Sequence, residues 1–152
     1  MTTTPGARTA GSLRVVIADD DPLVRASLSA LLADEPDFEV VGAASDGRAA
    51  VDLAVEHEPD LLTVDVQMPF GGPPLVRELT ALSHRPVVVG LSANADVATW
   101  TSMLAAGASG YLRKGELSSD LASLLRRCAR GDLVLSVPGA AALVRELLLG
   151  QR

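Results

Sequence analysis

The stretch Leu61-Leu62-Thr63-Val64-Asp65 is an almost uninterrupted apolar run that ends in an acid. Runs of this kind, without alternation of apolar and polar residues, are typical of parallel strands that are covered on both faces. In an open parallel sheet, ligands and functional groups gather in the crevice at the carboxyl ends of the strands. The stretch therefore predicts an α/β fold and places Asp65 where such a fold carries its chemistry.

Four further apolar segments repeat this pattern along the chain, at residues 13–18, 38–44, 87–91 and 109–112. Stretches with helical spacing of apolar residues follow the five segments, at about residues 22–32, 49–56, 74–82, 94–106 and 117–128. Strict alternation of strands and helices with short connections is typical of a parallel sheet with right-handed crossovers. The sequence thus predicts a doubly wound, five-stranded parallel sheet with helices on both faces.

The predicted sheet forms a single domain, residues 13–131, in a chain of 152 residues. Residues 1–12 are rich in Thr, Gly, Ala and Pro, and we expect them to form a disordered leader. Residues 132–152 form a C-terminal extension with an apolar helix at about 138–149. Since an apolar stripe has to be buried, this helix is expected to pack on its own domain, pair with another copy, or link to an output domain.

Composition excludes several classes of protein. The formal net charge of -6 gives the chain no electrostatic reason to bind DNA or an anionic membrane directly. No apolar segment is long enough to span a bilayer. With one cysteine and no apolar signal-peptide core at the N-terminus, we expect a cytoplasmic protein.

Polar groups at the ends of other predicted strands point to the crevice that contains Asp65. Asp19 and Asp20 close the first apolar run, Ser92 follows the fourth, and Lys114 follows the fifth. Carboxylates brought together in this way repel one another unless a cation joins them, and an oxygen-only ligand set suits Mg²⁺. Mg²⁺, a lysine and a hydroxyl group around a carboxylate nucleophile are sufficient for phosphoryl transfer. Taken alone, the acids after the first strand fit a helix cap equally well.

Four segments resemble the receiver domains of bacterial two-component response regulators: Ile17–Arg25, Asp65–Pro69, Leu91–Ala93 and Gly110–Lys114. The resemblance covers residues 13 to about 130. It is strongest to the subfamily that carries a LuxR/NarL-type helix-turn-helix output domain, and it implies a flavodoxin-like fold with strand order 2-1-3-4-5. The residues that follow Arg130 are too few for such an output domain, because a domain of under roughly 40 residues seldom folds alone.

The resemblance also implies a role for each site residue. Asp65 accepts a phosphoryl group from the phosphohistidine of a histidine kinase. Ser92 and Lys114 then contact the phosphoryl oxygens, and Tyr111 changes rotamer as Ser92 moves inward. The implied Mg²⁺ site consists of Asp19, Asp20, Asp65 and the backbone carbonyl of Gln67. The domain is thus expected to catalyse only its own phosphorylation and dephosphorylation.

The resemblance further implies an output through the face formed by the fourth helix, the fifth strand and the fifth helix. Trp100 lies on that helix, so we expect a homodimer or a protein target to bind there or at the C-terminal helix. Three alternatives remain open: a fragment of a longer DNA-binding regulator, a scaffold that works without phosphorylation, and a small Mg²⁺-dependent aspartyl phosphatase. The phosphatase needs a second acid two residues after its nucleophile, where Gln67 stands.

Overall fold

The computed structural model describes residues 12–93, 96–116, 120–136 and 140–150. Their strands and helices alternate along the chain: β1 (Leu13–Ala18), α1 (Pro22–Ala33), β2 (Phe38–Ala44), α2 (Gly47–His57), β3 (Leu61–Asp65), α3 (Gly72–Thr80), β4 (Val87–Ser92), α4 (Val97–Ala106), β5 (Gly110–Arg113), the 3₁₀ turn η1 (Lys114–Glu116), α5 (Leu121–Ala129), β6 (Val134–Ser136) and α6 (Ala140–Gly150). The strands form one sheet in the order β2-β1-β3-β4-β5-β6, and neighbouring strands are parallel. The predicted flavodoxin-like α/β fold is confirmed.

Local signals in the sequence account for where several helices begin and end. Asp21 caps α1 by accepting a hydrogen bond from the amide of Leu23 at 2.9 Å, and Pro22 opens the helix. Asp46 caps α2 in the same way, with the amide of Ala49 at 2.8 Å. Such side chains satisfy amides that have no partner within the helix. Gly107 ends α4 with a φ of 117°, a conformation that glycine adopts without strain.

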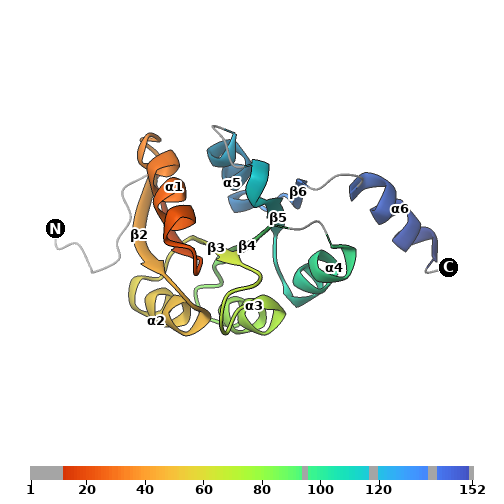
Figure 1. The fold of residues 1–152 in the computed structure, drawn as a ribbon, viewed down its shortest axis with the longest axis horizontal. Helices are drawn as coiled ribbons and strands as arrows, with labels where there is room; N and C mark the ends of the chain where they lie inside the picture. The colour runs from red at the N-terminus through yellow and green to blue at the C-terminus, as the bar shows by residue number, and fades with distance from the viewer. Residues whose placement is uncertain (1–11, 94–95, 117–119, 137–139, 151–152) are drawn as a thin grey trace.

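Helices cover both faces of the sheet (Figure 1). The first face lies under α1 and α5, and the second under α2, α3 and α4. Alternate residues of one strand point to opposite faces: Val15 and Ile17 belong to the core beside α1 and α5, whereas Val16 and Ala18 belong to the core beside the other three helices. Because both faces are buried, the strands are apolar throughout, as the sequence predicted.

The prediction of five strands was wrong by one. A sixth strand, β6, pairs in parallel with β5, and Tyr111 lies opposite Leu135 in the register. The strand has three residues, which is too short for alternation or length to reveal. The chain turns back at Gly131, whose φ of 99° suits glycine, and the open edge of β5 supplies the hydrogen-bonding partner.

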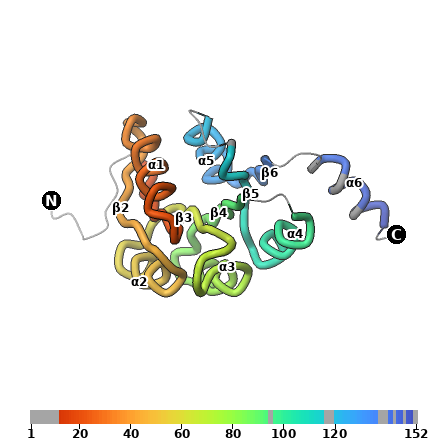
Figure 2. Tube along the Cα trace, viewed as in Figure 1, coloured from red at the N-terminus to blue at the C-terminus, as the bar shows by residue number. Residues whose placement is uncertain are grey.

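In the described part of the extension, α6 runs from Ala140 to Gly150, and residues 138 and 139 of the predicted helix lie outside the described residues. In Figure 2, α6 lies beyond β6, apart from the layers of the domain. Its Val144 is partly buried against the core beside α2, α3 and α4, whereas Leu148 is 65% exposed and Leu149 is 56% exposed. The predicted leader lies outside the described residues except for Ser12. No described helix combines the length and the apolar character that crossing a membrane requires.

Trp100 is not the exposed interface residue that we expected. Its side chain is 1% exposed and belongs to the core beside α2, α3 and α4, together with Met103 and Tyr111. The stripe of apolar residues on α4 therefore faces the sheet, not solvent. Helical spacing identifies such a stripe, but it does not say whether the stripe meets the protein's own sheet or a partner.

Candidate functional site

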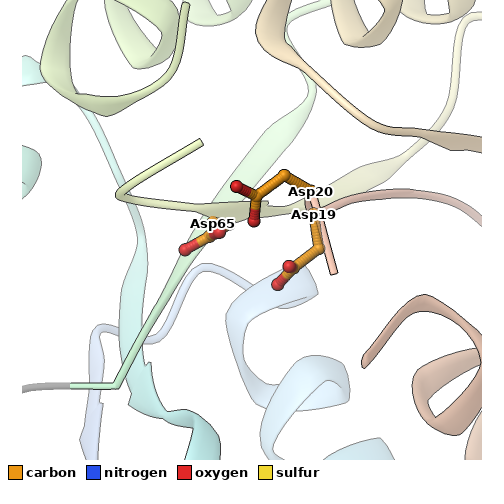
Figure 3. Close-up of side chains that lie close together, drawn as sticks. All are labelled: Asp19, Asp20 and Asp65. Atoms are coloured by element: carbon orange, nitrogen blue, oxygen red, sulfur yellow. The ribbon is translucent and has the colours of Figure 1, made fainter. Parts of the chain in front are cut away.

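The acids predicted to meet do so at the carboxyl ends of β1 and β3. The two strands are adjacent and parallel, with Ala18 opposite Val64, so Asp19 and Asp65 leave the sheet side by side. One ligand atom of each of Asp19, Asp20 and Asp65 lies within 4.8 Å of the other two (Figure 3). Asp19 and Asp65 are buried, at 0% and 3% exposure, while Asp20 is exposed to solvent.

Lys114 joins the two buried carboxylates. Its Nζ lies 2.8 Å from Oδ2 of Asp19 and 3.2 Å from Oδ1 of Asp65. Backbone amides hold the same carboxylates from the loops: the amide of Asp21 donates to Asp19 at 2.9 Å, and the amide of Gln67 donates to Asp65 at 3.2 Å. The contact between Lys114 and Oδ2 of Asp19 is an ion pair.

Burial and charge act in opposite directions on these groups. Burial raises the pKa of Asp65 and the charge of Asp19 adds to the rise, although the Gln67 amide and Lys114 oppose it. For Lys114, burial alone lowers the pKa, but the carboxylates of Asp19 and Asp65 outweigh burial and raise it above the ordinary value. Lys114 therefore stays protonated at neutral pH.

The donor set fits a divalent cation. Three carboxylates face a single ammonium group, so negative charge is left uncompensated, and Oδ2 of Asp19 is buried without an aligned hydrogen bond. Oxygen ligands of this kind suit Mg²⁺, which needs only one or two carboxylates besides water and phosphate oxygens. The residues that would hold the ion are Asp19, Asp20 and Asp65. The backbone carbonyl of Gln67 remains a predicted fourth ligand.

Ser92 and Tyr111 lie on the neighbouring strands β4 and β5. Ser92 ends β4 at 2% exposure, and Tyr111 is fully buried. Burial raises the pKa of the Tyr111 hydroxyl, while a hydrogen bond with Ser92 opposes this shift. The structure thus brings the predicted hydroxyl residue and the predicted switch aromatic into contact.

Sequence reasoning missed two features beside the site. Arg25 Nη1 donates to the backbone carbonyl oxygen of Asp19 at 2.6 Å. The available signal was a cation in the first turns of α1, where the helix dipole disfavours positive charge. In addition, the loop after Asp65 is fixed to α2, because the Gly47 amide donates to the Pro69 carbonyl at 2.9 Å. A side chain at Gly47 has no room, since its Cβ would overlap the Phe70 carbonyl oxygen.

Residues 15–126 match the family model of the response regulator receiver domain. The chain belongs to this family. The receiver domain is 33% identical over 121 residues to the transcriptional regulatory protein LiaR of Bacillus subtilis, covering 79% of this chain and 57% of LiaR. It is 37% identical over 126 residues to the nitrate/nitrite response regulator NarL of Escherichia coli, covering 80% of this chain and 57% of NarL.

A solved structure agrees with these relatives. The signal receiver domain of the response regulator NarL from Mycobacterium tuberculosis superimposes with a TM-score of 0.75 at 31% identity, over 79% of this chain and 98% of that one. Receiver domains are modules of phosphorylation-dependent two-component signalling that bind Mg²⁺ in an acidic pocket, interact with histidine kinases and often dimerise. In this chain the acids Asp19, Asp20 and Asp65 form a cluster at the corresponding end of the sheet.

Proposed function

We propose that this receiver domain accepts a phosphoryl group on Asp65 from the phosphohistidine of a histidine kinase. The observation that carries the proposal is the buried Asp65 carboxylate, which has the Lys114 ammonium 3.2 Å away and two further carboxylates beside it. An Asp65 oxygen attacks phosphorus, the bond between phosphorus and the histidine nitrogen breaks, and the electron pair leaves with the imidazole. An acyl phosphate on Asp65 is the product.

Each residue has a role that its position supports. Lys114 keeps Asp65 oriented before transfer and then offers its charge to the phosphoryl oxygens, which carry the negative charge of the transition state. Ser92, buried at the end of β4, offers a hydroxyl group to one of these oxygens. Asp19, Asp20, Asp65 and the Gln67 carbonyl would hold Mg²⁺, which would supply the positive charge that lets two anions approach each other.

We propose that phosphorylation of Asp65 changes the C-terminal extension and that this change is what a partner recognises. Tyr111 contacts Ser92 on one side and pairs with Leu135 of β6 on the other. Leu135 and Val144 pack against the core that contains Tyr111, which provides a route from a rotamer change of Tyr111 to β6 and, through Val144, to α6. We expected dimerisation at the face formed by α4, β5 and α5, and β6 now lies beside β5 in the sheet. Dimerisation or partner binding is therefore proposed at α6.

A second candidate function is favoured by the relatives. The chain spans 57% of the length of both LiaR and NarL, and LiaR is a transcriptional regulatory protein. In this second proposal the receiver domain is part of a longer regulator, and α6 connects it to a DNA-binding domain. The chemistry of Asp65 is the same in both proposals.

Acetyl phosphate with Mg²⁺ tests the proposed chemistry, with intact mass as the measurement. We expect a gain of one phosphoryl group in the wild type and in Asp52→Asn, which alters an exposed acid on α2, and no gain in Asp65→Asn. Continuous turnover of acetyl phosphate without accumulation of the phosphorylated form would support the phosphatase. An unmodified wild type would support the scaffold.

A further inference from the structure

Arg25 connects the second turn of α1 to the loop that carries the acids. Its Nη1 donates to the carbonyl oxygen of Asp19 at 2.6 Å, and its side chain is partly buried. This carbonyl belongs to the peptide group that joins Asp19 to Asp20. Because a peptide group is planar, the hydrogen bond fixes the plane from which the backbone of Asp20 continues.

The residues on either side of Asp20 are held by further hydrogen bonds. The amide of Asp19 donates to the carbonyl of Ala44 at 3.0 Å, and the amide of Asp21 donates to the Asp19 side chain at 2.9 Å. Among the residues that the structure describes, the Asp20 carboxyl group itself has no hydrogen-bond or ion-pair partner. Its direction towards Asp65 in Figure 3 therefore depends on the backbone.

The uncompensated charge of the acids attracts Arg25, but two effects oppose this attraction. A cation near the N-terminus of α1 is disfavoured by the helix dipole. A cation beside the acidic cluster also repels the divalent ion that the cluster fits. The hydrogen bond to Asp19 gives the residue a geometric role that can offset both costs.

We propose that Arg25 is a positioning residue for the Mg²⁺ site. Its hydrogen bond to the Asp19 carbonyl holds the Asp19–Asp20 peptide group so that the Asp20 carboxylate faces Asp65. The inference rests on the proposed function, since it assigns Arg25 to the metal site of the same phosphoacceptor. If the hydrogen bond positions Asp20, removal of the Arg25 side chain should weaken Mg²⁺ binding. If only the charge of Arg25 acts on the ion, its removal should strengthen Mg²⁺ binding, so the direction of the change tests the proposal.

The test is a Mg²⁺ titration followed by the NMR shifts of the Asp20 and Gln67 backbone amides. Arg25→Met keeps the apolar stem of the side chain and removes the donor, whereas Arg25→Lys keeps one donor and the charge. Arg77→Met, at an exposed position on α3, removes the same charge away from the site. Urea denaturation without Mg²⁺ shows whether each variant is folded.

We expect Arg25→Met to weaken Mg²⁺ binding by about fivefold, the equivalent of one hydrogen bond. Arg77→Met should bind like the wild type, and Arg25→Lys should bind more tightly than Arg25→Met. If Arg25→Met binds Mg²⁺ as tightly as Arg77→Met, or more tightly, the positioning role is wrong while the proposed function stands. If the wild type shows no Mg²⁺-dependent shift at Asp20 or Gln67, the proposed metal site is wrong, and so is the role of Arg25.

Discussion

Asp65 is the proposed phosphoacceptor, and the burial of its charge destabilises the folded protein. Its carboxylate is buried beside Asp19, and both effects raise its pKa, while Lys114 and the amide of Gln67 compensate in part. A buried charge that is incompletely paired destabilises the folded state. The site therefore holds electrostatic strain that a divalent cation would relieve.

Replacing Asp65 with Asn is expected to stabilise the metal-free domain at neutral pH. Removing an incompletely paired buried charge should raise the free energy of unfolding by roughly 1 kcal/mol or more, and Lys114 keeps Asp19 as its partner at 2.8 Å. Because the folded-state pKa of Asp65 is raised, this group favours folding while it is protonated, below the ordinary aspartate pKa of about 3.9. The contribution to the free energy of unfolding is lost as pH rises through the raised folded-state pKa and the buried carboxyl group becomes charged.

The gain from Asp65→Asn should therefore be largest at neutral pH and vanish in acid. Urea denaturation in EDTA at several pH values measures it, with Asp52→Asn as the control at an exposed acid. A destabilised Asp65→Asn at neutral pH would show that Lys114 and the loop amides fully compensate the charge.

At the scale of elements, β5 is the strand where the site meets the C-terminal extension. Gly110 opens β5 between α5 and β6, and a Cβ there would lie 2.9 Å from the sulfur of Cys128 and 3.2 Å from the carbonyl oxygen of Val134. Cys128 is a buried thiol, and burial raises its pKa to about 11, so it acts as an inert packing group. The absence of a side chain at Gly110 is thus what lets three elements approach closely.

Substituting Gly110 with Ala is expected to lower the free energy of unfolding by about 1–3 kcal/mol, because overpacking forces α5 or β6 to shift. Gly115→Ala is the matched control, since nothing lies within 4 Å of its Cβ position. Urea denaturation of both variants measures the difference. Equal stability of the two variants would show that β6 is not held against β5 as the structure has it.

On the scale of the whole molecule, the domain and α6 differ in how they bury apolar surface. The two cores on either side of the sheet are closed by five helices, while α6 lies apart and leaves Leu148 and Leu149 exposed. Exposed leucines on a helix outside the core are typical of an interface. The proposed interface on α6 therefore lies outside the layers of the domain.

Leu148→Glu is expected to weaken self-association of the phosphorylated domain without altering its stability. The exposed side chain contributes little to folding, so the free energy of unfolding should change by less than about 0.5 kcal/mol. Analytical ultracentrifugation with and without acetyl phosphate measures the association, and Val55→Glu is the control because Val55 is 60% exposed on α2. Identical association of the two variants would exclude α6 as the interface.

Local chemistry made most of the fold and the acidic site predictable. Apolar runs mark β1 to β5, Asp21 and Asp46 mark the starts of α1 and α2, and parallel pairing brings acids at strand ends together. These features follow from one residue and its neighbours along the chain, combined with the topology that βα alternation imposes. The meeting of Asp19, Asp65 and Lys114 could therefore be predicted from the order of the segments alone.

Only the tertiary structure decided which surfaces are covered. Trp100 faces the sheet, β6 closes the edge of β5, and Arg25 reaches back to the Asp19 carbonyl. Each of these contacts joins groups through space, and neither helical spacing nor strand length says which neighbour a side chain or a strand edge will meet. The sequence by itself determined which acids and which lysine meet at the strand ends, because strand order follows from the order of the segments, while packing through space determined which surfaces of the molecule remain open.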